Sequence, residues 1–412
     1  MYNFCSHILQ GILPNCGLTY YNIDKCNCNN TYDEHDVFLV IRGGSSTENA
    51  SEHGISHLLE HTIVLGVLYP EGQDFFSFPA YVQAFTNFNE TVFQFKLKND
   101  GFSYFSQCIY AIKNIFLSQG LYERMFILAK NEVENELDRM DFSINEALNA
   151  IPHTQSRNLK LPAGNLSCIS QLQFKDVIEH HRNWYLLEES SIIISSRFKT
   201  TKVVQLLADV FENNISMKDS SWNEPEISSE FLQKKDLCFE KRIPCITLFS
   251  VIERNFQQLD KYMLLSIGLG IALDALAIKI KRFCSARFVA CSVEIIGTDL
   301  WLVRLEIHQQ DHNVCNDILN LMDNPSLNKH DYINAKRRYT SKALRVLKKN
   351  KTQKPIDVFA ECVANFLYDE PVFDVLDEAK YILRALPEVN FDIVRRKFDA
   401  IVKNLVTTNP QK

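Results

Sequence analysis

The sequence predicts an α+β protein of two homologous domains, each a mainly antiparallel sheet covered by helices. The chain has 412 residues, which is too long for one ordinary domain and suits two of about 200 residues. Residues 216–230, SMKDSSWNEPEISSE, are polar, rich in serine and interrupted by a proline, as is typical of a linker. Because strand-like and helix-like patterns alternate on both sides of this segment, we expect one domain over residues 1–215 and another over residues 231–412.

The first half contains one clear strand and two helices that carry polar groups. The apolar run at residues 37–41, VFLVI, indicates a strand. Residues 57–61, HLLEH, form one turn of a predicted helix, and residues 121–140 predict a second helix rich in carboxylates.

The second half is expected to repeat this layout. Residues 239–252 are rich in strand-forming side chains, and residues 258–282 predict a helix or a pair of helices. Two further strands and a series of helical patterns follow at residues 288–296, 300–307, 311–322, 329–348, 356–368, 375–386 and 391–405.

The strongest indication of chemistry is the segment His57-Leu58-Leu59-Glu60-His61. Residues four apart on a helix lie one above the other, so His57 and His61 can hold one metal ion while Glu60 leans over its open position. A catalytic zinc typically has three protein ligands and one open position for water. Such a pentapeptide can also arise by chance, and two histidines at this spacing are often an ordinary solvated helix face.

A third ligand is expected on another helix. Within residues 121–140, Glu132 and Glu136 lie four apart on one face, whereas Glu134 points well away from Glu136. Glu136 follows His61 by 75 positions. Spacing on the helix alone leaves both Glu132 and Glu136 as candidates.

An H-x-x-E-H segment followed about 75 residues later by a glutamate resembles the pitrilysin and mitochondrial-processing-peptidase family, the inverted zincins. Residues 133–137, VENEL, are similar to the family's V-x-N-E-[IL] segment. The resemblance implies one Zn²⁺ per chain, held by His57, His61 and Glu136. It also implies that Glu60 is the general base.

Further segments extend the resemblance towards the substrate. The segment Gln83-Ala84-Phe85-Thr86 resembles the family's N-A-x-T motif, which implies that Gln83, Ala84 and Thr86 border the substrate. Gln83 keeps the amide of the usual asparagine but lengthens it. Residues 174–185 and 191–195 resemble the helix and strand that end the family's first domain.

Two departures concern groups near the zinc. The family's second half often carries an arginine and a tyrosine seven residues apart that touch the substrate. Arg282 and Phe288 lie in the nearest stretch here, so the tyrosine hydroxyl is missing. Many relatives carry a second glutamate where this chain has Ala129, and Glu132 is expected to replace it as a supporting carboxylate.

The resemblance implies a zinc-dependent endopeptidase that hydrolyses peptides or small unfolded chains, and some relatives mature ribosomally made peptides. In the family, two domains form a half-shell and two half-shells enclose a chamber. A homodimer, or a heterodimer with a related half-shell, is therefore expected. The alternative is a non-catalytic partner or scaffold subunit of a heterodimeric peptidase in the same family, but the full set of His57, Glu60, His61 and Glu136 favours an active member.

Composition excludes several other classes. The net charge of -6 comes without a basic block, which argues against a nucleic-acid partner. No uninterrupted run of eighteen apolar residues occurs and residues 1–16 do not resemble a signal peptide, so we expect no transmembrane segment and a cytoplasmic protein.

Two other patterns are weak candidates for a metal site. Cys26 and Cys28 lie in a polar segment, and without a second cysteine pair they indicate an exposed turn rather than a metal site. Residues 308–312, HQQDH, are expected to span a strand end rather than one helix face.

Overall fold

A computed structural model of the chain describes residues 8–24, 35–68, 80–97, 101–117, 121–139, 160–212, 245–254, 259–283, 288–296, 300–308, 326–349, 356–373, 375–403 and 405–407. The chain divides into two compact units. The first comprises Met1–Met140, Lys160–Leu232 and Thr352–Asp374, and the second comprises Asp141–Leu159, Gln233–Lys351 and Val375–Lys412. The predicted linker at 216–230 and the predicted helix at 311–322 lie outside the described residues, as do Cys26 and Cys28.

The first unit contains a six-stranded sheet. Its strands lie in the order β1 (Ile8–Ile12), β2 (Thr19–Asp24), β6 (Ser190–Ser196), β3 (Asp36–Ile41), β5 (Thr91–Leu97) and β4 (Ala80–Thr86). Four of the five pairings are antiparallel, and β2 with β6 is the parallel one. The expected mainly antiparallel sheet is thus confirmed, and β4 is its last strand.

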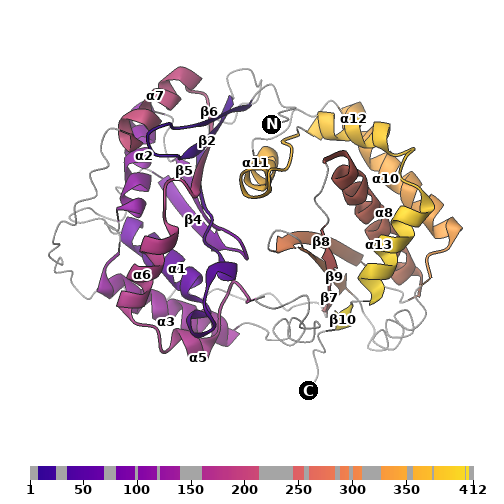
Figure 1. The fold of residues 1–412 in the computed structure, drawn as a ribbon, viewed down its shortest axis with the longest axis horizontal. Coiled ribbons are helices and arrows are strands. Elements are labelled where there is room, and N and C mark those ends of the chain that lie inside the picture. The colour runs from indigo at the N-terminus through magenta and orange to yellow at the C-terminus, as the bar shows by residue number, and fades with distance from the viewer. Residues whose placement is uncertain are drawn as a thin grey trace. The chain divides into compact units, whose positions relative to one another are not determined.

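Helices cover one face of this sheet. They are α1 (Ile55–Leu68), α2 (Phe102–Phe116), α3 (Glu123–Arg139), α5 (Leu166–Ile169), α6 (Phe174–Trp184) and α7 (Thr200–Phe211). Figure 1 shows α1, α2 and α6 on one side of the strands and α11 (Ile356–Tyr368) on the other. The central strands β3 and β6 are buried on both faces, which explains why residues 37–41 are apolar without alternation.

The helix α11 comes from the second half of the sequence but belongs to the first unit. Its Phe359 stacks on Phe38 of β3 with ring centroids 4.0 Å apart. The side-chain oxygen of Asn365 accepts hydrogen bonds from the Tyr21 hydroxyl at 2.6 Å and from the Gln10 amide at 3.1 Å. The C-terminal half therefore supplies the cover for the second face of the first sheet.

The start of α1 is fixed by a buried glutamate. Glu48 accepts hydrogen bonds from the backbone N–H groups of Gly54 at 2.9 Å and Ser56 at 3.0 Å, which satisfies donors that the first turn leaves unpaired. Gly54 has a φ of +105°, and a Cβ there would lie 2.9 Å from the Cα atom of Gly164. Only glycine permits both this backbone conformation and this close approach.

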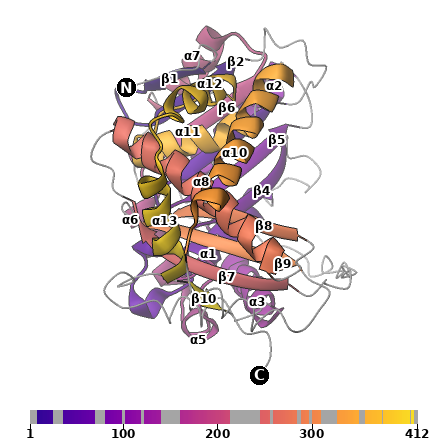
Figure 2. The same ribbon diagram turned by 90° about the vertical axis from the view of Figure 1, so that its right-hand side faces the viewer.

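The second unit has a four-stranded sheet in the order β10 (Val406–Thr407), β7 (Cys245–Glu253), β9 (Leu300–His308) and β8 (Phe288–Ile296). All its pairings are antiparallel. Its described helices are α8 (Leu259–Phe283), α10 (Lys329–Lys349), α12 (Val375–Ala385) and α13 (Phe391–Lys403). Figure 2 shows α8 between α10 and α13, beside the strands β7, β8 and β9.

Helix α8 is the central helix of the second unit. By length and composition its segment Tyr262–Arg282 could cross a membrane, but 67% of this apolar stretch is buried inside the protein. Its Asp274 forms an ion pair with Lys342 of α10 at 2.9 Å. These contacts are those of a core helix that packs against its own sheet and neighbours.

Candidate metal centre

Three potential metal ligands converge between α1 and α3, which pack against each other. The Nε2 atoms of His57 and His61 lie 3.7 Å and 3.6 Å from Oε2 of Glu136, and the three ligand atoms all lie within 4.8 Å of one another. The two histidines are adjacent because α1 brings residues four apart to the same face. Within the described residues, this is the only such group of three or more side chains.

Both imidazole rings are oriented by a second partner. His57 Nδ1 lies 3.1 Å from the carbonyl oxygen of Ala163, and His61 Nδ1 lies 3.2 Å from Oε2 of Glu132. A carbonyl or carboxylate oxygen accepts, so each Nδ1 donates, and in the neutral form of each ring the lone pair of Nε2 is directed towards Glu136. Such outer partners are typical of histidines that bind zinc. The donor set therefore fits a zinc ion with an open fourth position.

Glu60 lies on the same helix, between the two histidines in sequence, and is 5% exposed. Its Oε2 accepts a hydrogen bond from the hydroxyl of Thr86 at 3.0 Å. Burial raises the pKa of Glu60 to about 7, while the charge of His61 and the Thr86 hydrogen bond act in the opposite direction. The arrangement places a buried carboxylate next to the candidate metal ligands, and a pKa near the operating pH suits a general base.

The two histidines differ in their electrostatic surroundings. Burial and the neighbouring charge of His61 lower the pKa of His57 below its usual value. For His61, burial opposes the charged form, but the hydrogen bond to Glu132 and the nearby carboxylates of Glu60 and Glu136 outweigh it and raise the pKa. The nearby carboxylates thus favour positive charge at His61, the more exposed of the two rings. The same negative charge would favour a cation bound beside this ring.

The predicted substrate-binding residues of the first unit lie on β4. The side chain of Gln83 is exposed and that of Ala84 is half-buried, while Thr86 contacts Glu60. The Ala129 side chain is fully buried in the core, whereas Glu132 reaches His61. Roles for these side chains remain predictions.

Arg282 and Phe288 belong to the second unit. Arg282 forms an ion pair with the buried Asp331 at 3.2 Å, and the Phe288 side chain is 53% exposed. Their expected part in substrate binding also stays a prediction.

Sequence reasoning missed several groups that support the site. The carbonyl of Ala163 orients His57, and Glu48 fixes the start of α1. Every residue has a backbone carbonyl, so the type of residue in the sequence does not indicate which carbonyl contacts a histidine. The only available signal was the pair Gly54 and Gly164, whose close approach brings the residues around Ala163 to α1.

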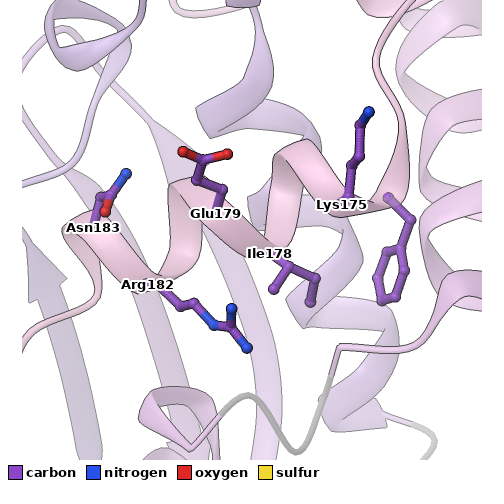
Figure 3. A pocket seen from close by; sticks show the side chains of 6 residues that line it. Lys175, Ile178, Glu179, Arg182 and Asn183 are labelled. Carbon is purple, nitrogen blue, oxygen red and sulfur yellow. The ribbon is translucent and has the colours of Figure 1, made fainter.

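A surface hollow on α6 is separate from this site (Figure 3). It is lined by Phe174, Lys175, Ile178, Glu179, Arg182 and Asn183, and none of these is a predicted ligand. The buried side of α6 instead supports the metal helix, since His180 Nε2 lies 3.1 Å from the hydroxyl oxygen of Ser56 in α1.

Comparison with known proteins identifies related sequences. Residues 28–164 match the family described as insulinase, peptidase family M16. The Haemophilus influenzae protein named "Probable zinc protease PqqL" is 28% identical over 219 residues, which make up 50% of this chain and 23% of that protein. The match therefore spans less than a quarter of this relative.

Solved structures show the same fold. The periplasmic protease PqqL from Escherichia coli has a TM-score of 0.73 at 14% identity, over 97% of this chain and 47% of that chain. A peptidase M16 inactive domain from Pseudomonas fluorescens has a TM-score of 0.66 at 12% identity, over 97% and 96% of the two chains. At these identities the likeness concerns the fold alone, and active and inactive domains share it.

Proposed function

We propose that this chain, which belongs to the insulinase family of peptidases, M16, is a zinc-dependent endopeptidase. One observation carries the proposal: His57, His61 and Glu136 place three ligand atoms within 4.8 Å of one another, on and beside the helix that carries the buried carboxylate of Glu60. Zinc held by these three side chains would supply Lewis acidity, which would polarise a peptide carbonyl and lower the pKa of a water molecule towards neutrality.

Glu60 is the residue proposed to move protons. It takes a proton from the water that attacks the scissile carbonyl and passes it to the nitrogen of the leaving amine. Its position on the metal helix, one residue before His61, supports this role. Glu132 is proposed to hold the ring of His61 and to take no part in proton transfer.

We propose that the substrate is a peptide in extended form that pairs with β4. This strand is the last in its sheet among the described strands, so its outer edge can accept another strand. The side chains of Tyr81, Gln83 and Phe85 alternate along its exposed face, with Tyr81 65% and Phe85 42% exposed. A paired peptide would place alternate side chains next to these three groups.

A second half-shell is proposed to complete the enzyme, as a further copy of this chain or a related one. The support is that this chain covers 47% of the Escherichia coli protease. Which kind of partner it takes, whether it matures a particular peptide and whether it works in the cytoplasm stay predictions.

Peptide cleavage tests the proposal. The zinc-loaded protein is incubated with a library of quenched fluorescent peptides, alongside Glu60→Gln and the control Glu134→Gln. We expect cleavage by the wild type and by Glu134→Gln, and a loss of about a hundredfold or more in Glu60→Gln, the usual contribution of a general base. If the zinc-loaded wild type cuts no peptide, either alone or with a second M16 half-shell, the peptidase proposal is wrong. The alternative, a non-catalytic partner or scaffold subunit, is then the better explanation.

A further inference from the structure

Thr86 lies at the end of the edge strand β4, where the chain turns into β5. It is the last residue of β4 and pairs with Thr91, the first residue of β5. The turn between them is closed by hydrogen bonds from the Asn87 backbone to the Glu90 carbonyl at 2.8 Å and from the Asn87 amide to the Glu90 carboxylate at 2.7 Å. Thr86 therefore lies at the base of a hydrogen-bonded hairpin whose strand β4 packs against α1.

The Thr86 hydroxyl has one proton and two neighbouring oxygens to which it could donate that proton, one on Glu60 and one on Thr91. Thr86 Oγ1 lies 3.0 Å from Oε2 of Glu60 and 3.4 Å from Oγ1 of Thr91. Thr91 gives its own proton to the carbonyl oxygen of Gly43 at 2.7 Å. In the ionised form in which a general base takes up a proton, Glu60 only accepts, so the single proton of Thr86 goes to Glu60, its nearer acceptor.

This hydrogen bond is a contact that can fix the plane of the Glu60 carboxylate. The last torsion of a glutamate side chain has a broad preference, so rotamer choice alone does not fix that plane. In the part of the chain that the structure describes, no other hydrogen bond to Glu60 is found. With Oε2 engaged by Thr86, Oε1 has no hydrogen bond to the described residues and could accept one from a water molecule.

We propose that Thr86 is a positioning residue that orients Glu60 for proton transfer, rather than a residue that binds the substrate. The inference rests on the proposed peptidase function and deepens it. It replaces the expectation from the sequence that Thr86 borders the substrate. A small error in the placement of a base can cost about a hundredfold in rate, so the hydroxyl should matter for kcat and not for KM.

Two substitutions separate the hydroxyl from the shape of the side chain. Thr86→Val keeps the branched shape and removes the donor, and Thr86→Ser keeps the donor. Thr62→Val is the matched control, because Thr62 is a buried threonine on α1 whose hydroxyl donates within the helix to the Leu58 carbonyl. Zinc content, the midpoint of thermal unfolding, kcat and KM are measured for all three variants.

We expect Thr86→Val to lose about ten- to a hundredfold in kcat, with KM and zinc content within about twofold of wild type. Thr86→Ser should recover kcat to within about threefold, and Thr62→Val should retain it. A rise in KM without a fall in kcat, or equal losses in the Val and Ser variants, overturns the inference.

Crystal structures provide a readout that does not depend on activity. The Glu60 carboxylate should rotate away from its wild-type plane in Thr86→Val and keep it in Thr86→Ser. If the zinc-loaded wild type cuts no peptide, the proposed function fails by itself. An unmoved carboxylate in Thr86→Val overturns the positioning role in either case.

Discussion

The Nδ1 atom of His61 lies 3.2 Å from Oε2 of Glu132, a carboxylate one helical turn before Glu136. This contact turns the other ring nitrogen of His61 towards Oε2 of Glu136, 3.6 Å away. The two glutamates on one face of α3 therefore make different contacts: Glu136 approaches Nε2 of both histidines, and Glu132 contacts Nδ1 of His61.

Replacing Glu132 with glutamine should weaken zinc binding without abolishing it. The amide cannot balance charge on His61 as the carboxylate does, and loss of such an outer partner typically costs 10- to 100-fold in metal affinity. Competition with a chromophoric chelator measures the change. Glu134→Gln, on a different face of α3, is the control and should bind zinc as the wild type does. An unchanged affinity in Glu132→Gln would remove Glu132 from the site.

The buried His181 should make the first unit sensitive to acid. It is 2% exposed and its Nε2–H donates to the carbonyl of Ile115 at 2.7 Å. Burial lowers its pKa to about 4, against the usual 6.5. The unfolded chain therefore binds a proton at this histidine more readily than the folded chain does. The contribution of His181 to the free energy of unfolding is complete above pH 6.5 and is lost as the pH falls towards 4.

His181→Gln keeps a donor for Ile115 but cannot titrate. Between pH 7.5 and 5 the free energy of unfolding of the wild type should fall by about 2 kcal/mol more than that of the variant. Urea unfolding at a series of pH values measures this difference. His330→Gln, at a side chain that is 75% exposed, should follow the wild type. Parallel curves for wild type and His181→Gln would contradict the assignment.

The Asn365 side chain should stabilise the first unit, although it comes from the second half of the sequence. Asn365→Leu removes the acceptor for the buried Tyr21 hydroxyl, and an unsatisfied buried donor costs about 1–3 kcal/mol. Urea unfolding measures the loss, with exposed Asn135→Leu on α3 as the control. A change below about 0.5 kcal/mol, the size typical of surface substitutions, would show that the Asn365 hydrogen bond does not stabilise this sheet.

Local patterns in the sequence predicted much of the fold. The predicted strand at 37–41 lies within β3, and the helix expected at 258–282 is the single helix α8. Both segments are buried, and burial leaves a regular apolar pattern. The division at residue 231 assigned 356–368 to the second domain, whereas α11 joins the first unit. An apolar helix face in a sequence predicts that the face is buried, but it does not predict which sheet the helix packs against.

The same limit applies to the site. The spacing of His57 and His61 follows from the helix period, so their proximity was predictable from the chain alone. The contact between Thr86 and Glu60 depends on how β4 packs against α1, which the sequence does not encode at any fixed spacing. The carbonyl of Ala163 depends on a loop crossing near Gly54.

Zinc stoichiometry tests the central claim most directly. The protein is stripped with a chelator, reloaded with zinc, freed of excess metal and analysed for metal content, together with Glu60→Gln and Glu136→Gln. We predict about one zinc per chain in the wild type and in Glu60→Gln, and far less in Glu136→Gln, because catalytic zinc needs three protein ligands. A wild type that retains no zinc, or a Glu136→Gln variant that retains it fully, would contradict the account.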